Sequence, residues 1–106
     1  MKTFFTLLGA VVFAWNPAVA ADVELGRAKA VKCKQCHGLD GIGKLPNFPN
    51  IAGQKDAYLV AQLRAYRDGK REDQMMSFIA KDLSDEDIGN LAAYYASIKF
   101  EVTVPE

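Results

Sequence analysis

Both cysteines and the one histidine of this 106-residue chain lie within five positions, in the run Cys33-Lys34-Gln35-Cys36-His37. Two thiols three positions apart can form thioether bonds to the two vinyl groups of one porphyrin. A histidine that directly follows the second thiol is then carried under the iron. The C-x-x-C-H pattern therefore predicts one covalently attached haem, held through Cys33 and Cys36, whose iron is bonded by His37.

Other uses of a C-x-x-C pair fit this chain less well. A thioredoxin-like redox pair begins a helix that follows a strand, and no strand pattern precedes Cys33. A structural zinc site needs about four cysteine or histidine ligands, and this chain has two cysteines and one histidine. A disulfide in an exported protein would account for both cysteines but would leave the adjacent His37 without a role.

A thioether is the natural sixth ligand, because soft sulfur stabilises reduced iron and raises its reduction potential. Met75 and Met76 are neighbours in segment 70–77, which we expect to be a loop between two helices. Methionine is often simply a core residue, and the residue pattern alone does not indicate which of the two methionines bonds the iron.

Segment 38–54 is rich in glycine, proline and asparagine, which indicates an ordered loop rather than a long helix or a central strand. A histidine bonded to a metal usually donates its other ring proton to an acceptor that fixes the ring. We expect a backbone carbonyl of this loop to be that acceptor for His37, and prefer Pro46 to Pro49.

Three segments show the apolar spacing of amphipathic helices: 22–32, 56–68 and 85–98. Acidic residues begin the first, Gly69 is placed to end the second, and Ser84 can cap the third. The stripes are Leu25, Ala28 and Val31; Tyr58, Leu59, Gln62, Leu63 and Tyr66; and Ile88, Leu91, Ala92 and Tyr95. No useful strand alternation appears, so we predict an all-α domain with three main helices and short helical turns around one haem.

The first twenty residues predict an export signal. Lys2 precedes an apolar run at 4–15, which is shorter than the roughly 20 residues that a bilayer span needs. Ala18-Val19-Ala20 has the small-x-small pattern that signal peptidase recognises. We therefore expect cleavage after Ala20, a domain formed by 21–106, a periplasmic location and no stable membrane insertion; the alternative is an uncleaved anchor.

The charge balance excludes some partners. Without Lys2, 12 of the 13 basic residues remain beside 13 acidic ones, a formal charge of minus one, which predicts neither nucleic acid nor an anionic membrane as partner. Segment 21–55 has six basic and three acidic residues, whereas 56–106 has six and ten. The basic half carries the cysteines and could steer an acidic redox partner, although such charge runs are usually just solvated faces.

The chain resembles the class I c-type cytochromes, and among them the small bacterial periplasmic kind whose domains also occur in pairs in dihaem cytochromes of the c-four type. The likeness covers essentially all of 21–106. Beyond the haem motif it rests on 38–41 (GLDG), 46–54 (PNFPNIAGQ), 58–59 (YL), 62–63 (QL), 67–69 (RDG), 83–88 (LSDEDI) and 91–95 (LAAYY).

The resemblance implies ligands and contacts. In that family the axial methionine lies seven residues before the leucine of the Leu-Ser-Asp motif, which here indicates Met76 rather than Met75. The resemblance also implies that Pro46 faces the histidine ligand, and that the first and last helices cross beside the haem with Gly26 and Tyr95 near their contact.

With both axial positions filled, the iron can only gain and lose an electron, so we expect no enzyme activity. The predicted function is a monomeric one-electron carrier between a respiratory membrane complex or dehydrogenase and a terminal oxidase or reductase. A fixed electron-transfer subunit of a periplasmic oxidoreductase is the main alternative. A ligand-binding or peroxidase-like haem protein would require an absent or labile methionine.

Overall fold

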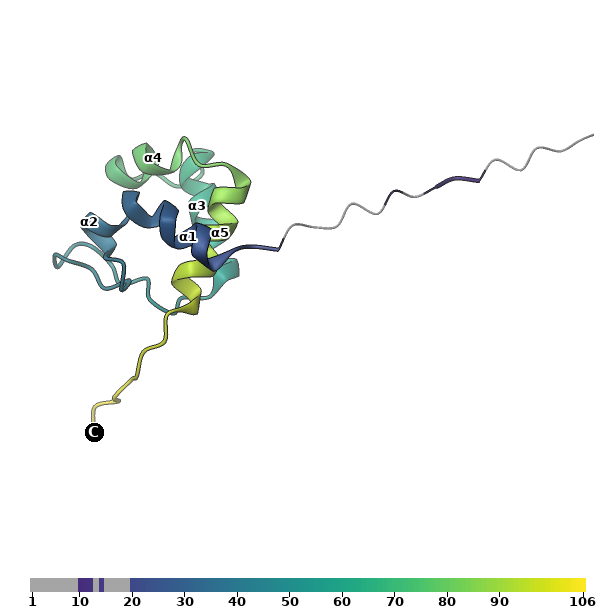
Figure 1. Ribbon diagram of the computed structural model, residues 1–106. Helices are drawn as coiled ribbons and strands as arrows, with labels where there is room; N and C mark the ends of the chain where they lie inside the picture. The colour runs from purple at the N-terminus through teal and green to yellow at the C-terminus, as the bar shows by residue number, and fades with distance from the viewer. Residues whose placement is uncertain (1–9, 13, 15–19) are drawn as a thin grey trace, which may run out of the picture.

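Figure 1 shows the computed structural model of the chain, which describes residues 10–12, 14 and 20–106. Most of the expected export signal, at 1–9, 13 and 15–19, lies outside the described residues. Within the described part, no helix is both long enough and apolar enough to span a bilayer.

The described part of the chain is helical and contains no strand. Its elements, in order, are α1 (Val23–Lys29), the 3₁₀ turn η1 (Ala30–Lys32), α2 (Lys34–His37), α3 (Asp56–Arg67), α4 (Gln74–Ala80) and α5 (Asp85–Ser97). The predicted all-α class and the three main helices are confirmed. In Figure 1, α1 crosses α5 near the centre, α4 lies at the top, and the extended C-terminal tail leaves the domain.

The centre of the fold is the crossing of α1 with α5. Gly26 of α1 is buried there, and a Cβ atom at this position would overlap the backbone carbonyl of Asn90. The side chain of Asn90 in turn accepts a hydrogen bond from the amide of Asp22 at 2.8 Å. The crossing at Gly26 follows the expectation; the Cβ atom of Tyr94 lies beside it, and Tyr95 is buried in the adjoining core. A glycine is required because the two backbones approach each other directly.

This crossing also decides which face of α1 is buried. The stripe of Leu25, Ala28 and Val31 was expected to share one face of this helix, yet it is exposed, at 53% for Leu25 and 57% for Val31. The buried positions are instead Gly26 of α1 and Ala30, which lies four residues later and begins η1. Because small residues permit the close approach to α5, they turn the larger side chains away from the core.

Of the other two main helices, α5 follows the predicted stripe, whereas in α3 only Leu59 is buried and Tyr58, also expected in the stripe, is 49% exposed. The α5 stripe is buried throughout: Ile88, Leu91, Ala92 and Tyr95. Ser84 caps α5, and its hydroxyl accepts a hydrogen bond from the amide of Asp87 while the Asp87 carboxylate accepts from the amide of Ser84. Gly69 ends α3 with φ of +75°, as expected for a left-handed cap. α3 packs on both α4 and α5.

Candidate functional site

The two cysteines and the histidine are brought together by one helical turn. Cys33 ends η1 and starts α2, and its carbonyl oxygen accepts hydrogen bonds from the amides of Cys36 at 3.2 Å and His37 at 2.9 Å. Both cysteines are free and partly buried. Burial and the neighbouring Cys36 raise the pKa of the Cys33 thiol to about 11, although Lys32 opposes this. At neutral pH this thiol is therefore protonated.

His37 is buried, and its ring is held by the loop that follows it. The Nδ1 atom lies 2.8 Å from the carbonyl oxygen of Pro49, which can only accept, so Nδ1 donates; in the neutral tautomer that this bond selects, the lone pair is on Nε2. The expectation that Pro46 supplies this carbonyl is wrong. Pro46 lies at the corner of a turn in which the amide of Phe48 donates to the carbonyl of Leu45 at 2.9 Å, and Pro49 follows that turn.

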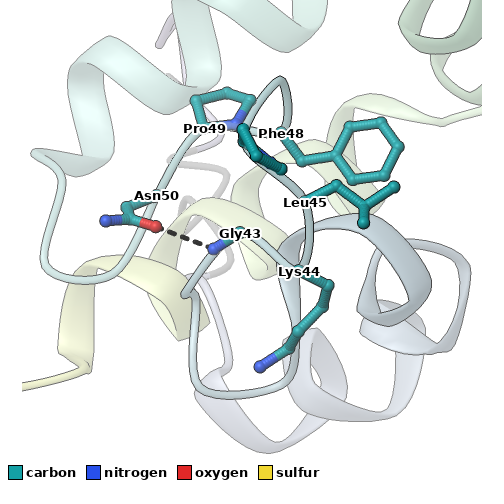
Figure 2. A pocket seen from close by; sticks show the side chains of 7 residues that line it. Gly43, Lys44, Leu45, Phe48, Pro49 and Asn50 are labelled. Carbon is teal, nitrogen blue, oxygen red and sulfur yellow. Dashed lines mark hydrogen bonds between the residues drawn. The ribbon is translucent and has the colours of Figure 1, made fainter.

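The loop of residues 38–54 is closed by hydrogen bonds to its own backbone. The carbonyl oxygen of Gly41 accepts from the amides of Ile51 at 2.8 Å and Ala52 at 3.0 Å. Gly41 has φ of +73°, and a Cβ atom there would lie 2.7 Å from the amide nitrogen of Ala52. The amide of Gly43 donates to Asn50 Oδ1 at 2.7 Å, which is the dashed bond in Figure 2.

Part of this loop surrounds an open cavity of about 510 Å³ (Figure 2). Leu45 and Phe48 point to one side of the loop and Asn50 lies on the other. The lining includes Pro49, whose carbonyl holds His37. The full lining is Gly43, Lys44, Leu45, Pro46, Phe48, Pro49 and Asn50. The loop therefore fixes the histidine ring and presents apolar side chains nearby.

Two consecutive tyrosines of α5 hold the residues that follow His37. The Tyr95 hydroxyl donates to the carbonyl of Gly38 at 2.9 Å, and the Tyr94 hydroxyl donates to that of Leu39 at 2.6 Å. The Tyr95 side chain is only 3% exposed, and burial raises the pKa of its hydroxyl. The apolar stripe predicted that Tyr95 is buried, but it did not predict these bonds to residues more than fifty positions away. The only available signal was a hydroxyl on a buried ring, which needs a partner.

Met75 and Met76 lie in the first turn of α4 rather than in the expected loop. Asp73 caps this helix, and its Oδ1 atom accepts from the amides of Met75 at 3.0 Å and Met76 at 2.9 Å. Met75 is 56% exposed, whereas Met76 is half-buried. Of the two sulfur-bearing side chains, Met76 is thus the one directed more toward the protein.

The residues present fit a haem. A free imidazole nitrogen beside two free thiols is the donor set that covalent haem attachment uses. Exposed apolar side chains occur in the segments around both candidate ligands, and a porphyrin face could remove them from water: Leu39, Ile42, Leu45, Met75 and Phe78. Within the part of the chain that the structure describes, no group of three or more histidine, cysteine or acidic residues could hold a metal ion by itself.

Comparisons with known proteins place the chain among cytochromes. Residues 21–94 match the family described as cytochrome C oxidase, cbb3-type, subunit III. The chain is 46% identical over 83 residues to cytochrome c4 of Pseudomonas aeruginosa, covering 78% of this chain and 41% of the relative. It is 46% identical over 81 residues to cytochrome c-554(548) of Halomonas halodenitrificans, covering 74% of this chain and 98% of the relative.

The fold has a counterpart among solved structures. The crystal structure of reduced recombinant cytochrome c4 from Pseudomonas stutzeri matches with a TM-score of 0.72 and 38% identity, covering 78% of this chain and 48% of that one. The chain thus spans about half the length, or less, of the two c4 relatives, and nearly all of cytochrome c-554(548).

Proposed function

This chain belongs to the cytochrome c family and resembles one half of a dihaem c4-type cytochrome, and we propose on that premise that it is a one-electron carrier. Family membership implies a covalently bound haem c, which when bound supplies an iron that changes oxidation state by one electron. The observation that carries the proposal is the single turn that places free Cys33 and Cys36 beside buried His37.

We assign each of these side chains a separate role. Cys33 and Cys36 form the two thioether bonds, and Nε2 of His37 bonds the iron. The Pro49 carbonyl keeps the proton on Nδ1 of His37 and fixes the ring, and this hydrogen bond also makes the imidazole a stronger donor. Tyr94 and Tyr95 hold the chain directly after the histidine, so that the ring and its acceptor keep their relative positions.

We assign the sixth position to Met76. Its side chain is half-buried, whereas that of Met75 is 56% exposed. Its position in the sequence, seven residues before Leu83, agrees with the spacing in the family. A thioether at this position raises the reduction potential. With His37 and Met76 both bonded to the iron, no position would remain for a substrate, so the haem would transfer electrons and we expect no enzyme activity.

The proposed setting is the periplasm, after cleavage behind Ala20. The donor is a membrane complex or a dehydrogenase, and the acceptor is an oxidase, a reductase or another cytochrome. Encounters of this kind use small, transient interfaces. The basic segment 21–55, which contains the haem motif, would favour a partner with an acidic surface.

The ligand assignment is tested by two methionine variants. In oxidised cytochromes an absorbance band near the red edge of the visible spectrum reports the iron–sulfur bond. Met76→Ala is expected to abolish this band, and Met75→Ala, its matched neighbour, is expected to keep it. Loss of the band in Met75→Ala alone would show that Met75, and not Met76, is the ligand.

A fixed subunit of an oxidoreductase complex is the second candidate, and the description of the matching family as an oxidase subunit favours it. Size-exclusion chromatography of native extract separates the two, with haem absorbance followed across the column. A free carrier elutes alone at about the size of one small domain. Co-elution of all the haem absorbance with a much larger complex would support the fixed subunit.

A further inference from the structure

The segment between α3 and α4 is anchored at its middle by one arginine. Arg71 Nη1 donates to Gln62 Oε1 at 2.7 Å, and the guanidinium lies 4.6 Å from the centroid of the Tyr66 ring. The amides of Lys70 and Arg71 both donate to the carbonyl of Ala65, at 2.9 and 3.1 Å. These contacts fix the chain against α3 at Arg71, three residues before α4 begins at Gln74.

Asp73 then joins this anchored segment to the turn that bears the methionines. Its carboxylate accepts from the amides of Met75 and Met76, and its own amide donates to Ser77 Oγ at 3.0 Å. The carbonyl of Asp73 also accepts from the amide of Ser77 at 2.8 Å. The side chain of Asp73 thus binds the backbone of the first turn, and the side chain of Ser77 binds the backbone of Asp73 in return.

This cap matters because α4 is short. The helix has seven residues, and isolated helices below about 12 to 15 residues are marginal in water. A seven-residue helix therefore depends on its cap and on its packing against α3. If the first turn unwinds, the backbone of Met76 moves with it.

We propose that Asp73 is a positioning residue for Met76: by capping the amides of Met75 and Met76 it holds closed the turn whose opening would release the thioether from the iron. The inference rests on the proposed function, since it takes Met76 as the sixth ligand. Asp73 acts through the backbone and does not touch the iron or the porphyrin.

The test measures how readily an external base displaces the thioether. Imidazole is titrated into the oxidised holoprotein, and the loss of the iron–sulfur band is followed. Asp73→Ala is expected to raise the apparent imidazole affinity about fivefold, which corresponds to about 1 kcal/mol, the usual magnitude for loss of an N-cap. Ser77→Ala, which removes the other half of the reciprocal cap, is expected to raise it about twofold.

Two control variants separate positioning from other effects. Asp73→Asn removes the charge but keeps a good capping oxygen, so its imidazole affinity should stay close to that of the unmodified protein. Ser84→Ala removes the cap of α5, which bears no ligand, and should lower the denaturant midpoint without changing the imidazole affinity.

Each outcome has a definite meaning. Unchanged imidazole affinity in Asp73→Ala overturns the inference, and so does an equal rise in Ser84→Ala or in Asp73→Asn. If the unmodified holoprotein lacks the iron–sulfur band, the assignment of Met76 fails first, and the inference fails with it. A rise confined to Asp73→Ala and Ser77→Ala supports it.

Discussion

The segment after His37 is tied to distant parts of the chain, whereas the segment around Met76 is held mainly by its neighbours in sequence. On the histidine side, Tyr94 and Tyr95 reach back across more than fifty positions to the backbone of Leu39 and Gly38. On the methionine side, the cap of Asp73 spans two to four residues, and most of its polar groups are exposed.

This difference gives the two sides different stabilities. Bonds that join α5 to the loop are expected to break when the main core opens, because α5 contributes half of the buried apolar side chains described in the core. Exposed local bonds open in smaller fluctuations. The histidine side should therefore unfold with the whole domain, and the methionine side should open first.

The largest expected effect contrasts two glycines that have nearly the same φ. Gly41→Ala, on the histidine side, combines left-handed strain with a Cβ atom 2.7 Å from the backbone of Ala52, and should cost about 3 kcal/mol. Gly69→Ala, next to the methionine segment, has open space around its Cβ and should cost about 1 kcal/mol from strain alone. Denaturant unfolding of both holoproteins measures the difference, and equal losses would contradict this contrast.

A smaller effect is expected from the two tyrosines. Tyr95→Phe leaves the ring in place but removes the hydroxyl that binds Gly38 in a buried setting, and should cost about 1 kcal/mol. Tyr94→Phe removes a more exposed bond and should cost less than about 0.5 kcal/mol. The measurement is again the free energy of unfolding. A greater loss in Tyr94→Phe would show that the exposed bond, rather than the buried one, anchors the loop.

The smallest effect concerns an exposed ion pair that joins the end of α3 to the start of α5, on either side of the methionine segment. Arg67, at the end of α3, donates to Asp85 Oδ1 at 2.8 Å, and this hydrogen bond, with the charges of Arg67 and Arg64, lowers the pKa of Asp85. A carboxyl group whose pKa is lower in the folded than in the unfolded state stabilises the fold at pH values above its unfolded-state pKa. This contribution is lost as the pH falls through the folded-state pKa. The free energy of unfolding should therefore decline with acid below about pH 4.

Asp85→Asn should make that decline shallower, because residue 85 then no longer takes up a proton on unfolding. The effect is small since the pair is exposed to solvent. Urea unfolding at a series of acidic pH values, in the variant and the unmodified protein, gives the two slopes. If the free energy of unfolding of Asp85→Asn falls with pH as steeply as that of the unmodified protein, the pair of Arg67 and Asp85 does not contribute to the pH dependence.

The elements governed by local rules were predictable from the sequence. Ser84 and the acidic residues after it start α5, the left-handed Gly69 ends α3, and the stripe from Ile88 to Tyr95 is buried. The haem motif is equally local, since Cys33, Cys36 and His37 share one turn. In each case, residues close in sequence determine the structure.

The predictions that were wrong concern structure that the local sequence pattern does not determine, such as the packing of one element against another. The buried face of α1 is set by its crossing with α5 at Gly26, and not by the larger apolar residues of α1 itself. The acceptor for His37 is Pro49, which follows the turn formed by residues 45–48, and not Pro46 within that turn. α4 was expected to be a loop because seven residues give too little periodicity, and only the cap at Asp73 marks its start.

The most direct test of the central claim is the intact mass of the chain after it is exported in cells that attach haem to proteins. The holoprotein is denatured in acidified solvent, so that any haem held only by iron ligands dissociates. A haem bonded to Cys33 and Cys36 stays attached, and the predicted mass is that of the polypeptide plus one haem; Cys33→Ala with Cys36→Ala gives the polypeptide alone. A bare polypeptide mass for the unmodified protein, with no visible colour, would contradict the account.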